Sequence, residues 1–306
     1  MLRHLLPLAL LLASATATAE TLVIDGVPRT YELRTPQQHA APLVLVLHGN
    51  TEQGRNILEH TTWPEVARRE GFVLVAPDGL NRAWADFRGH GEAVGKRPPA
   101  GTDDVKFLTR LVDDLVQRGV ADPQHIYVAG ISNGGAMAMS LACVRPDLFA
   151  AASSTIMAMT RGLAAHCHPS QGTPMLFMNG TEDPLVNFNG GRGTNRMMGV
   201  SGLLSTEDTL RWWRGVDGCA RDDGAASNLP DRVRDDNSSV TRIGSHCPAG
   251  SDVLLYRING GGHRLPDTIA DSVHLTGMID RLLGRQNRDI QGPQVIWDFL
   301  KQFARH

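Results

Sequence analysis

The chain has little net charge and, after its first residues, no apolar run long enough to cross a bilayer. Its 306 residues carry 30 Lys and Arg against 32 Asp and Glu, for a formal net charge of -2. This balance gives no electrostatic case for binding nucleic acid or an anionic membrane surface. Aromatic residues make up only 5%, but 42% of the residues are hydrophobic, which is enough for a large ordered core.

The first 19 residues have the pattern of a signal peptide. The apolar run 5–13 is too short to span a bilayer, and Ala17-Thr18-Ala19 offers the small-x-small pattern that signal peptidase cleaves. We therefore predict a signal peptide over residues 1–19 and a single catalytic domain over residues 20–306. The product would be secreted or periplasmic, with no membrane contact after cleavage. The alternative is an uncleaved anchor helix.

Cysteine is scarce, and its even number is typical of disulfides in an exported chain. The four cysteines are Cys143, Cys167, Cys219 and Cys247. Of the three possible pairings we favour Cys219–Cys247, which would close the polar stretch between them, and this leaves Cys143–Cys167. Free buried thiols are the alternative. A zinc site at His166, Cys167 and His168 matches no common ligand spacing, so no metal is expected.

Short apolar runs alternate with amphipathic helices along the chain. Five runs are typical of parallel strands buried on both faces, at residues 43–47, 72–76, 125–129, 175–178 and 253–258. Helical spacing is found at residues 103–118 and 294–304. An antiparallel edge pair is predicted over residues 21–33, and polar loops over 190–202 and 221–250. The pattern predicts an α/β fold with helices on both faces of a mostly parallel sheet.

The segment Gly130-Ile131-Ser132-Asn133-Gly134 matches the nucleophile motif G-x-S-x-G. An apolar strand at residues 125–129 leads into it, and a helix at 135–144 leads out. This strand–turn–helix context is that of a nucleophile elbow, in which a tight turn lifts a serine hydroxyl above the sheet edge. The motif predicts Ser132 as the nucleophile.

A serine nucleophile needs a base, and the base needs an acid that orients it. In α/β-hydrolases these follow in the order Ser, Asp, His, each after a later strand. Asp183 comes after the strand at 175–178, with Glu182 as the fallback. His263 follows the strand at 253–258 through a Gly-rich turn, with His274 as the runner-up. Asp183 and His263 are therefore the predicted acid and base.

Acyl transfer also needs donors for the developing oxyanion. We expect one from the backbone amide of Asn133 and another from the amide of Asn50 or Thr51. His48 is expected to brace that loop or to contact substrate, and Trp84 is a candidate substrate contact. Trp212 and Trp213 could bind sugar or aryl groups, although their helical segment favours a core position for at least one. The chemistry needs no cofactor.

At these motifs the sequence resembles the secreted α/β-hydrolase esterases that include polyhydroxybutyrate depolymerases, and is related to feruloyl and acetylxylan esterases. The matching segments are 42–49 (PLVLVLHG), 102–107 (TDDVKF), 126–136 (IYVAGISNGGA), 179–186 (NGTEDPLV), 253–263 (VLLYRINGGGH), 288–290 (RDI) and 296–299 (IWDF). The resemblance covers nearly the whole predicted mature chain. It implies the α/β-hydrolase fold, the triad Ser132, Asp183 and His263, and a Cys219–Cys247 disulfide.

Two segments depart from the family pattern. An aromatic-Pro pair often follows the catalytic histidine, but here His263 is followed by Arg264-Leu265-Pro266. A cysteine-bearing loop is common at residues 84–99, and this chain has none there. Both segments would flank the acyl pocket, so they concern the choice of substrate rather than the chemistry.

The expected function is a secreted, monomeric serine esterase that hydrolyses carboxylic esters. Polyhydroxybutyrate or its oligomers are the first expectation for the substrate, and the feruloyl or acetyl esters of plant cell-wall polysaccharide are the alternative. A peptidase or thioesterase on the same fold is a further rival. An alternative of a different class is a non-catalytic secreted binding protein on a hydrolase scaffold.

Overall fold

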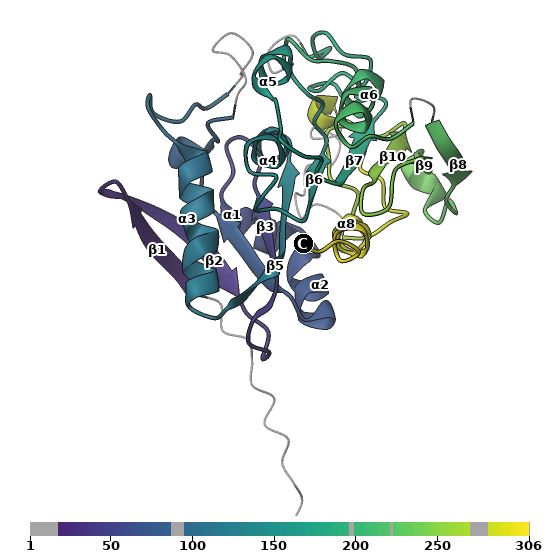
Figure 1. The fold of residues 1–306 in the computed structure, drawn as a ribbon. Coiled ribbons are helices and arrows are strands. Elements are labelled where there is room, and N and C mark those ends of the chain that lie inside the picture. The colour runs from purple at the N-terminus through teal and green to yellow at the C-terminus, as the bar shows by residue number, and fades with distance from the viewer. Residues whose placement is uncertain (1–17, 87–94, 196–198, 221–222, 270–280, 306) are drawn as a thin grey trace, which may run out of the picture.

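The computed structural model describes residues 18–86, 95–195, 199–220, 223–269 and 281–305. In this part of the chain ten strands form one sheet, in the order β1-β2-β4-β3-β5-β6-β7-β10-β9-β8. It runs from β1 at the left of Figure 1 to β8 at the right. The strands are β1 (Thr18–Ile24), β2 (Val27–Arg34), β3 (Ala41–Leu47), β4 (Val73–Pro77), β5 (Ala121–Ile131), β6 (Ala151–Thr155), β7 (Met175–Gly180), β8 (Asp223–Asn228), β9 (Ser239–Ser245) and β10 (Val253–Asn259).

The centre of the sheet is parallel and both of its edges are antiparallel. Parallel pairing links β4, β3, β5, β6, β7 and β10 in turn. The hairpin β1–β2 joins β4 antiparallel at one edge, and β9 and β8 extend β10 antiparallel at the other. The α/β-hydrolase architecture and the antiparallel N-terminal edge are therefore confirmed.

Helices cover both faces of the sheet. The helices are α1 (Gly54–His60), α2 (Trp63–Glu70), α3 (Asp104–Gln117), α4 (Asn133–Val144), α5 (Arg161–His166), α6 (Thr206–Val216) and α8 (Gly292–Leu300). Leu43 and Leu45 of β3 pack in one core cluster with residues of α3, α4 and α6. The alternate residues Val44 and Val46 pack in a second cluster with α1, α2 and α8. Because successive side chains of a strand point to opposite faces, the continuous apolar run of β3 serves both cores.

The polar loop expected over residues 221–250 is wrong. Strands β8 and β9 lie there, and β9 pairs with β10 from Leu255↔Ile243 to Asn259↔Ser239. Strands in an antiparallel part of a sheet can have one face open to water, so their sequences carry polar residues that resemble a loop. Strand β6, with the sequence AASST, also went unpredicted because its residues are small and only weakly hydrophobic.

Both expected disulfides are present, Cys143–Cys167 and Cys219–Cys247, so all four cysteines are paired. This removes Cys167 as a metal ligand. No group of three His, Cys, Asp or Glu side chains in the described part of the chain could hold a metal ion. Among the same residues, no helix has the length and apolar character needed to cross a bilayer.

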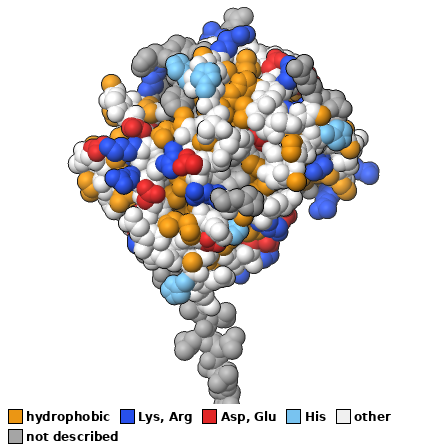
Figure 2. Space-filling view, viewed as in Figure 1, with side chains coloured by type: hydrophobic (Ala, Val, Ile, Leu, Met, Phe, Trp, Pro, Cys, Tyr) orange, Lys and Arg blue, Asp and Glu red, His pale blue; other side chains and the backbone are white. Residues whose placement is uncertain are grey.

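The surface carries charges of both signs. On the face seen in Figure 2, blue and red side chains are interspersed and form no broad area of one charge. This agrees with the small net charge of the sequence. Trp213 is fully buried and lies edge-on against the partly buried Trp212, which places one of the two tryptophans in the core as the helical spacing indicated.

Candidate active site

Ser132 sits at the sharp junction between β5 and α4. Its backbone has φ 54° and ψ -116°, a conformation that non-glycine residues rarely adopt and that is typical of strained functional turns. A Cβ at Gly130 would lie 2.0 Å from the carbonyl oxygen of Gly134, and one at Gly134 would lie 2.2 Å from that of Leu47. Only glycine permits these approaches, so the strand, turn and helix can meet as the motif predicts.

A line of hydrogen bonds joins three side chains that are far apart in sequence. The Nε2 atom of His263 lies 2.9 Å from Ser132 Oγ, and Nδ1 of the same ring lies 2.7 Å from Asp183 Oδ2. The carboxylate can only accept, so Nδ1 carries the proton and Nε2 is left to accept from the serine hydroxyl. The three residues expected to form the triad are brought together in the order that general-base activation of a serine requires.

Asp183 is fixed by its own turn. Its Oδ1 atom accepts the backbone N–H groups of Leu185 and Val186, each at 2.8 Å, while Oδ2 faces the imidazole. Its side chain is only 2% exposed. The fallback acid Glu182 is 65% exposed and pairs with Arg285 instead, so it has no part in the line. The runner-up base His274 lies outside the described residues.

His263 is held by the segment 283–289, which we call the strap and which forms an isolated parallel bridge between Arg285 and Gly261. The amides of Gly262 and His263 donate to the carbonyls of Arg285 and Leu283. A Cβ on Gly180 would lie 2.3 Å from the carbonyl oxygen of Gly261, so the turn before the histidine packs directly on the end of β7. This contact keeps the imidazole close to the strand that precedes Asp183.

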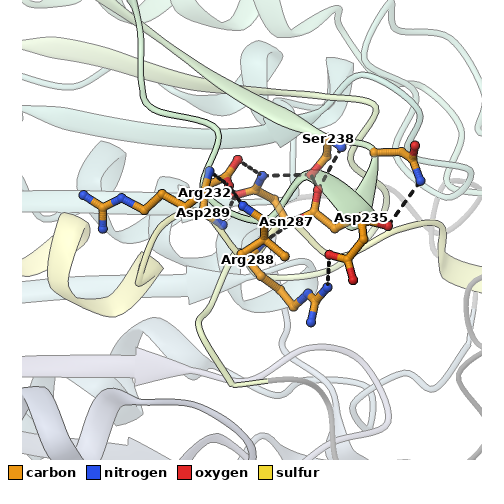
Figure 3. Close-up of polar contacts among 9 residues, drawn as sticks. Arg232, Asp235, Ser238, Asn287, Arg288 and Asp289 are labelled. Atoms are coloured by element: carbon orange, nitrogen blue, oxygen red, sulfur yellow. Dashed lines mark hydrogen bonds and ion pairs between the residues drawn. The ribbon is translucent and has the colours of Figure 1, made fainter.

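Buried polar groups anchor the strap to the loop that precedes β9 (Figure 3). Asp289 Oδ1 accepts the amides of Arg232 and Val233 at 2.7 and 2.9 Å. Asn287 Nδ2 donates to Ser238 Oγ and to Asp289 Oδ2 at 2.8 and 2.9 Å. The segment 288–290, which the family resemblance singled out, therefore has a structural role. It anchors the strap that holds His263.

Two backbone amides are available for an oxyanion. Asn133 is the first residue of α4, where no carbonyl of the helix can accept its N–H. In the loop after β3, the Gly49 amide donates to Glu52 Oε2 at 3.0 Å and the Thr51 amide donates to Arg82 O at 2.9 Å. Of the two loop residues expected, the geometry therefore favours Asn50 over Thr51.

Ser132 and His263 open into a cavity of about 340 Å³. Its lining combines apolar side chains, among them Ile131, Ile156, Leu185 and Val200, with polar ones, among them Glu52, Asn56, His60 and Gln286. Sequence reasoning missed Ile156, which has a φ of 50°, unusual for a β-branched residue. No local pattern in the sequence signals this conformation.

The chain is similar in sequence to several proteins described as esterases. Residues 66–160 match the prolyl oligopeptidase family. The chain is 29% identical to a Nocardia uniformis subsp. tsuyamanensis protein described as "Putative esterase NocK", over 89% of this chain and 80% of that protein. It is 25% identical to feruloyl esterase B of Piromyces equi over 87% of this chain, but spans only 42% of that enzyme. Over 35% of this chain it is 35% identical to a poly(3-hydroxybutyrate) depolymerase of Ralstonia pickettii, spanning 23% of that enzyme.

Among solved structures, the acetyl xylan esterase from Aspergillus awamori superposes with a TM-score of 0.57. It is 14% identical, over 86% of this chain and 98% of that one, which bears on the fold alone. The chain is a serine esterase of the α/β-hydrolase fold.

The esterase does not use His48 and Trp84 as substrate contacts in the way the sequence suggested. His48 is fully buried, donates from Nδ1 to Gly49 O at 2.7 Å, and accepts the Gly79 amide at Nε2 at 2.9 Å. Burial lowers the pKa of its imidazole to about 4, so the ring is neutral at pH 7. Trp84 is 2% exposed, and neither residue lines the cavity. The bracing role expected for His48 agrees with these contacts; the substrate-contact assignments are wrong, because burial behind the site depends on tertiary packing.

Proposed function

We propose that the chain is an exported esterase whose catalytic triad is Ser132, Asp183 and His263. The observation that carries the proposal is the unbroken line of hydrogen bonds from Asp183 through His263 to Ser132 Oγ. His263 Nε2 takes the serine proton as Oγ attacks the ester carbonyl, and Asp183 stabilises the imidazolium. His263 then protonates the leaving alcohol, and water releases the acyl group by the same steps. The chemistry is carried by these side chains and needs no cofactor.

The developing oxyanion lies between the amides of Asn133 and Asn50. Both donors are backbone groups, which are fixed before the reaction and so cost little reorganisation as charge develops. The start of α4 packs so closely on the loop after β3 that a Cβ on Gly134 would lie 2.6 Å from His48 O. This proximity supports the assignment of one donor from each side.

For the substrate we propose 3-hydroxybutyrate oligomers or the polymer. The apolar side chains in the lining of the cavity that holds Ser132 suit a short aliphatic acyl unit, and the local similarity to the Ralstonia pickettii depolymerase supports the same class. Feruloyl or acetyl esters of plant polysaccharide are the second candidate. The similarity to the Piromyces equi feruloyl esterase supports it, because it extends over 87% of this chain.

We further propose that residues 20–306 form one exported domain that acts as a monomer outside the cytoplasm. The two disulfides support export, since such bonds persist in oxidising compartments. The single continuous sheet supports one domain.

A fluorophosphonate probe tests the catalytic assignment directly. We expect the probe to label one serine per chain, and Ser132→Ala to abolish labelling while leaving the fold intact. The same variant should lower kcat for p-nitrophenyl butyrate by about four orders of magnitude or more. Failure of the folded wild-type protein to react would favour a non-catalytic binding protein.

A substrate panel separates the candidates that share this chemistry. Hydroxybutyrate trimer, methyl ferulate, acetylated xylan, a thioester and a peptide amide are compared by kcat/KM. We expect the trimer to be the best substrate. A higher value for methyl ferulate or acetylated xylan would select the cell-wall esterase, and preference for the amide or thioester would select the remaining rivals.

A further inference from the structure

Trp84 makes hydrogen bonds to both sides of the proposed oxyanion hole. Its backbone N–H donates to Asn133 Oδ1 at 2.8 Å, and its indole Nε1–H donates to His48 O at 3.0 Å. Asn133 begins α4, and His48 ends the stretch that leads into the loop holding Asn50. One buried residue therefore connects two segments that approach the site from different strands.

Building on the proposed function, we propose that Trp84 is a positioning residue that fixes the amides of Asn133 and Asn50 relative to each other. The indole ring adds packing to its two hydrogen bonds: its centroid lies 4.8 Å from that of the His48 imidazole. His48 in turn holds Gly49 and Gly79 through its two ring nitrogens. The oxyanion loop is thus tied to α4 through the tryptophan.

The segment around Trp84 is itself anchored in the core. The amide of Ala85 donates to Asp104 Oδ2 at 2.7 Å, and Asp104 Oδ1 accepts from Arg29 Nη2 at 2.6 Å. The guanidinium of Arg29 lies 3.8 Å from the ring centre of Phe107. Asp104 and Phe107 belong to the TDDVKF segment, for which the triad offers no use. The contacts of this segment instead hold the tryptophan segment in place.

The position of the two amides matters most after the carbonyl oxygen has become negatively charged. Preorganised donors stabilise that charge strongly only when they lie at hydrogen-bond distance from it, and small misplacements lower the rate. The neutral ester depends much less on them. Loosening the connection through Trp84 should therefore lower kcat and leave KM nearly unchanged.

Trp84→Phe removes the indole donor and keeps most of the ring packing. Trp297→Phe is the matched control, because Trp297 is also buried and its Nε1–H donates to a carboxylate, Glu70 Oε2, at 3.0 Å. For p-nitrophenyl butyrate we expect Trp84→Phe to lower kcat about tenfold with KM within about twofold. Trp297→Phe should leave both constants within about twofold of wild type, whatever it costs in thermal stability.

A transition-state analogue gives a readout that a purely structural role would not move. An aliphatic trifluoromethyl ketone forms a hemiketal whose oxygen would occupy the oxyanion site. Its Ki should rise in Trp84→Phe by the same factor by which kcat/KM falls. In case Trp84→Phe folds poorly, Asn133→Ala is the second variant. It removes the hydrogen bonds between the Asn133 side chain and the backbone of Trp84, together with the one that this side chain donates to Asp86 Oδ2, and should show the same division between kcat and KM.

Fluorophosphonate titration counts the active sites of each variant, so kcat refers to folded enzyme only. The inference is overturned if Trp84→Phe and Asn133→Ala retain wild-type kcat, or if their KM rises in place of a fall in kcat. It is also overturned if Trp297→Phe lowers kcat as much as Trp84→Phe does. These outcomes leave the triad in place. Failure of the wild-type enzyme to be labelled would instead overturn the proposed function.

Discussion

The acid–base half and the oxyanion half of the site are built in different ways. Asp183 is held by amides two and three residues further along its own turn. Trp84, in contrast, reaches Asn133 and His48, which are 49 and 36 residues away in sequence. In one half the acid is oriented by its own local turn, and in the other the oxyanion donors are positioned by buried contacts between distant segments. Substitutions in the acid–base half should therefore lower activity alone, whereas substitutions in the oxyanion half should lower both activity and stability.

A substitution on the acid–base side should remove activity without affecting the fold. We expect Asp183→Asn to lower kcat by about 10³-fold to 10⁴-fold, because an amide opposite Nδ1 favours the wrong imidazole tautomer. The asparagine oxygen can still accept the amides of Leu185 and Val186, so unfolding should change little. Steady-state hydrolysis of p-nitrophenyl butyrate measures the effect.

Glu182→Gln is the matched control for this prediction. The neighbouring glutamate is exposed and, among the described residues, pairs with Arg285 across 3.5 Å, so kcat should stay within about twofold of wild type. If the glutamine variant lost activity as severely as Asp183→Asn, the assignment of the acid to residue 183 would be wrong.

A substitution on the oxyanion side should damage activity and stability together. In Gly134→Ala the new methyl group would lie 2.2 Å from Leu47 O and 2.6 Å from His48 O, so α4 and the oxyanion loop must separate. We expect kcat to fall about 10²-fold, as when an oxyanion donor is lost, and the free energy of unfolding to fall by about 1–3 kcal/mol. Urea unfolding and kcat are measured on the same preparation.

Gly215→Ala serves as its control, because a Cβ at this α6 position meets nothing within 4 Å. Alanine there should stabilise the protein by about 0.5–1 kcal/mol and leave kcat unchanged. Equal loss of kcat in both variants would show that the enzyme responds to glycine replacement in general rather than to separation of the two segments.

The difference between local patterns and contacts across the fold also explains which parts of the site the sequence could predict. The order Ser132, Asp183, His263 follows from motifs at the ends of apolar strands, and each residue lies next to the pattern that identifies it. Trp84 was misassigned, because only the folded chain shows that Asn133 and His48 enclose it. Strands β8 and β9 were missed for a related reason: β9 is defined by its pairing with β10, and β8 by its pairing with β9, rather than by their own polar residues.

Two buried carboxyl groups of the enzyme differ in their partners. Burial raises the pKa of both, and at Asp104 the nearby Arg29 cation opposes that rise, whereas no cation opposes it at Asp217. Asp104 supports the Trp84 segment and has the cation Arg29 as its partner. Asp217 ties together the segments that lead into β7 and β10, and its donors are the Thr173 amide and the Ser251 hydroxyl, both neutral. Burial raises the pKa of Asp217 to about 7.

Asp217 should therefore make the enzyme less stable as pH rises. Its carboxyl keeps a proton in the folded state up to about pH 7, whereas in the unfolded chain it ionises near the ordinary aspartate pKa of 3.8. The folded state thus binds more protons between these values, and the free energy of unfolding falls as pH rises through that window. Asp217→Asn removes this contribution.

Urea unfolding at pH 5 and pH 7 measures the difference. We expect wild type to lose about 2 kcal/mol more than Asp217→Asn over this interval. Asp104→Asn is the comparison on the oxyanion side; it leaves Arg29 buried without its anion, so it should destabilise at both pH values. Equal pH dependence in wild type and Asp217→Asn would contradict the raised pKa.

The smallest effect is expected from a substitution at Ile156 in the cavity wall, and it concerns the preferred length of the acyl chain. Ile156 follows β6, holds its left-handed backbone through an N–H bond to Met178 O at 2.7 Å, and lines the cavity beside Ser132. Ile156→Val keeps the β-branched side chain, and therefore the same backbone strain, but removes one carbon from the apolar wall.

The space gained should accept about one more methylene of an acyl chain, which is worth about 0.8 kcal/mol. The ratio of kcat/KM for p-nitrophenyl pentanoate, whose acyl chain is one methylene longer, to that for the butyrate should thus rise about fourfold. Ile126→Val, in the core of β5 and away from the cavity, makes the same chemical change and should leave the ratio where it is. A shift of the same size in both variants would mean that acyl preference follows general loosening of the core, and the wall at residue 156 would lose its part in selecting the substrate.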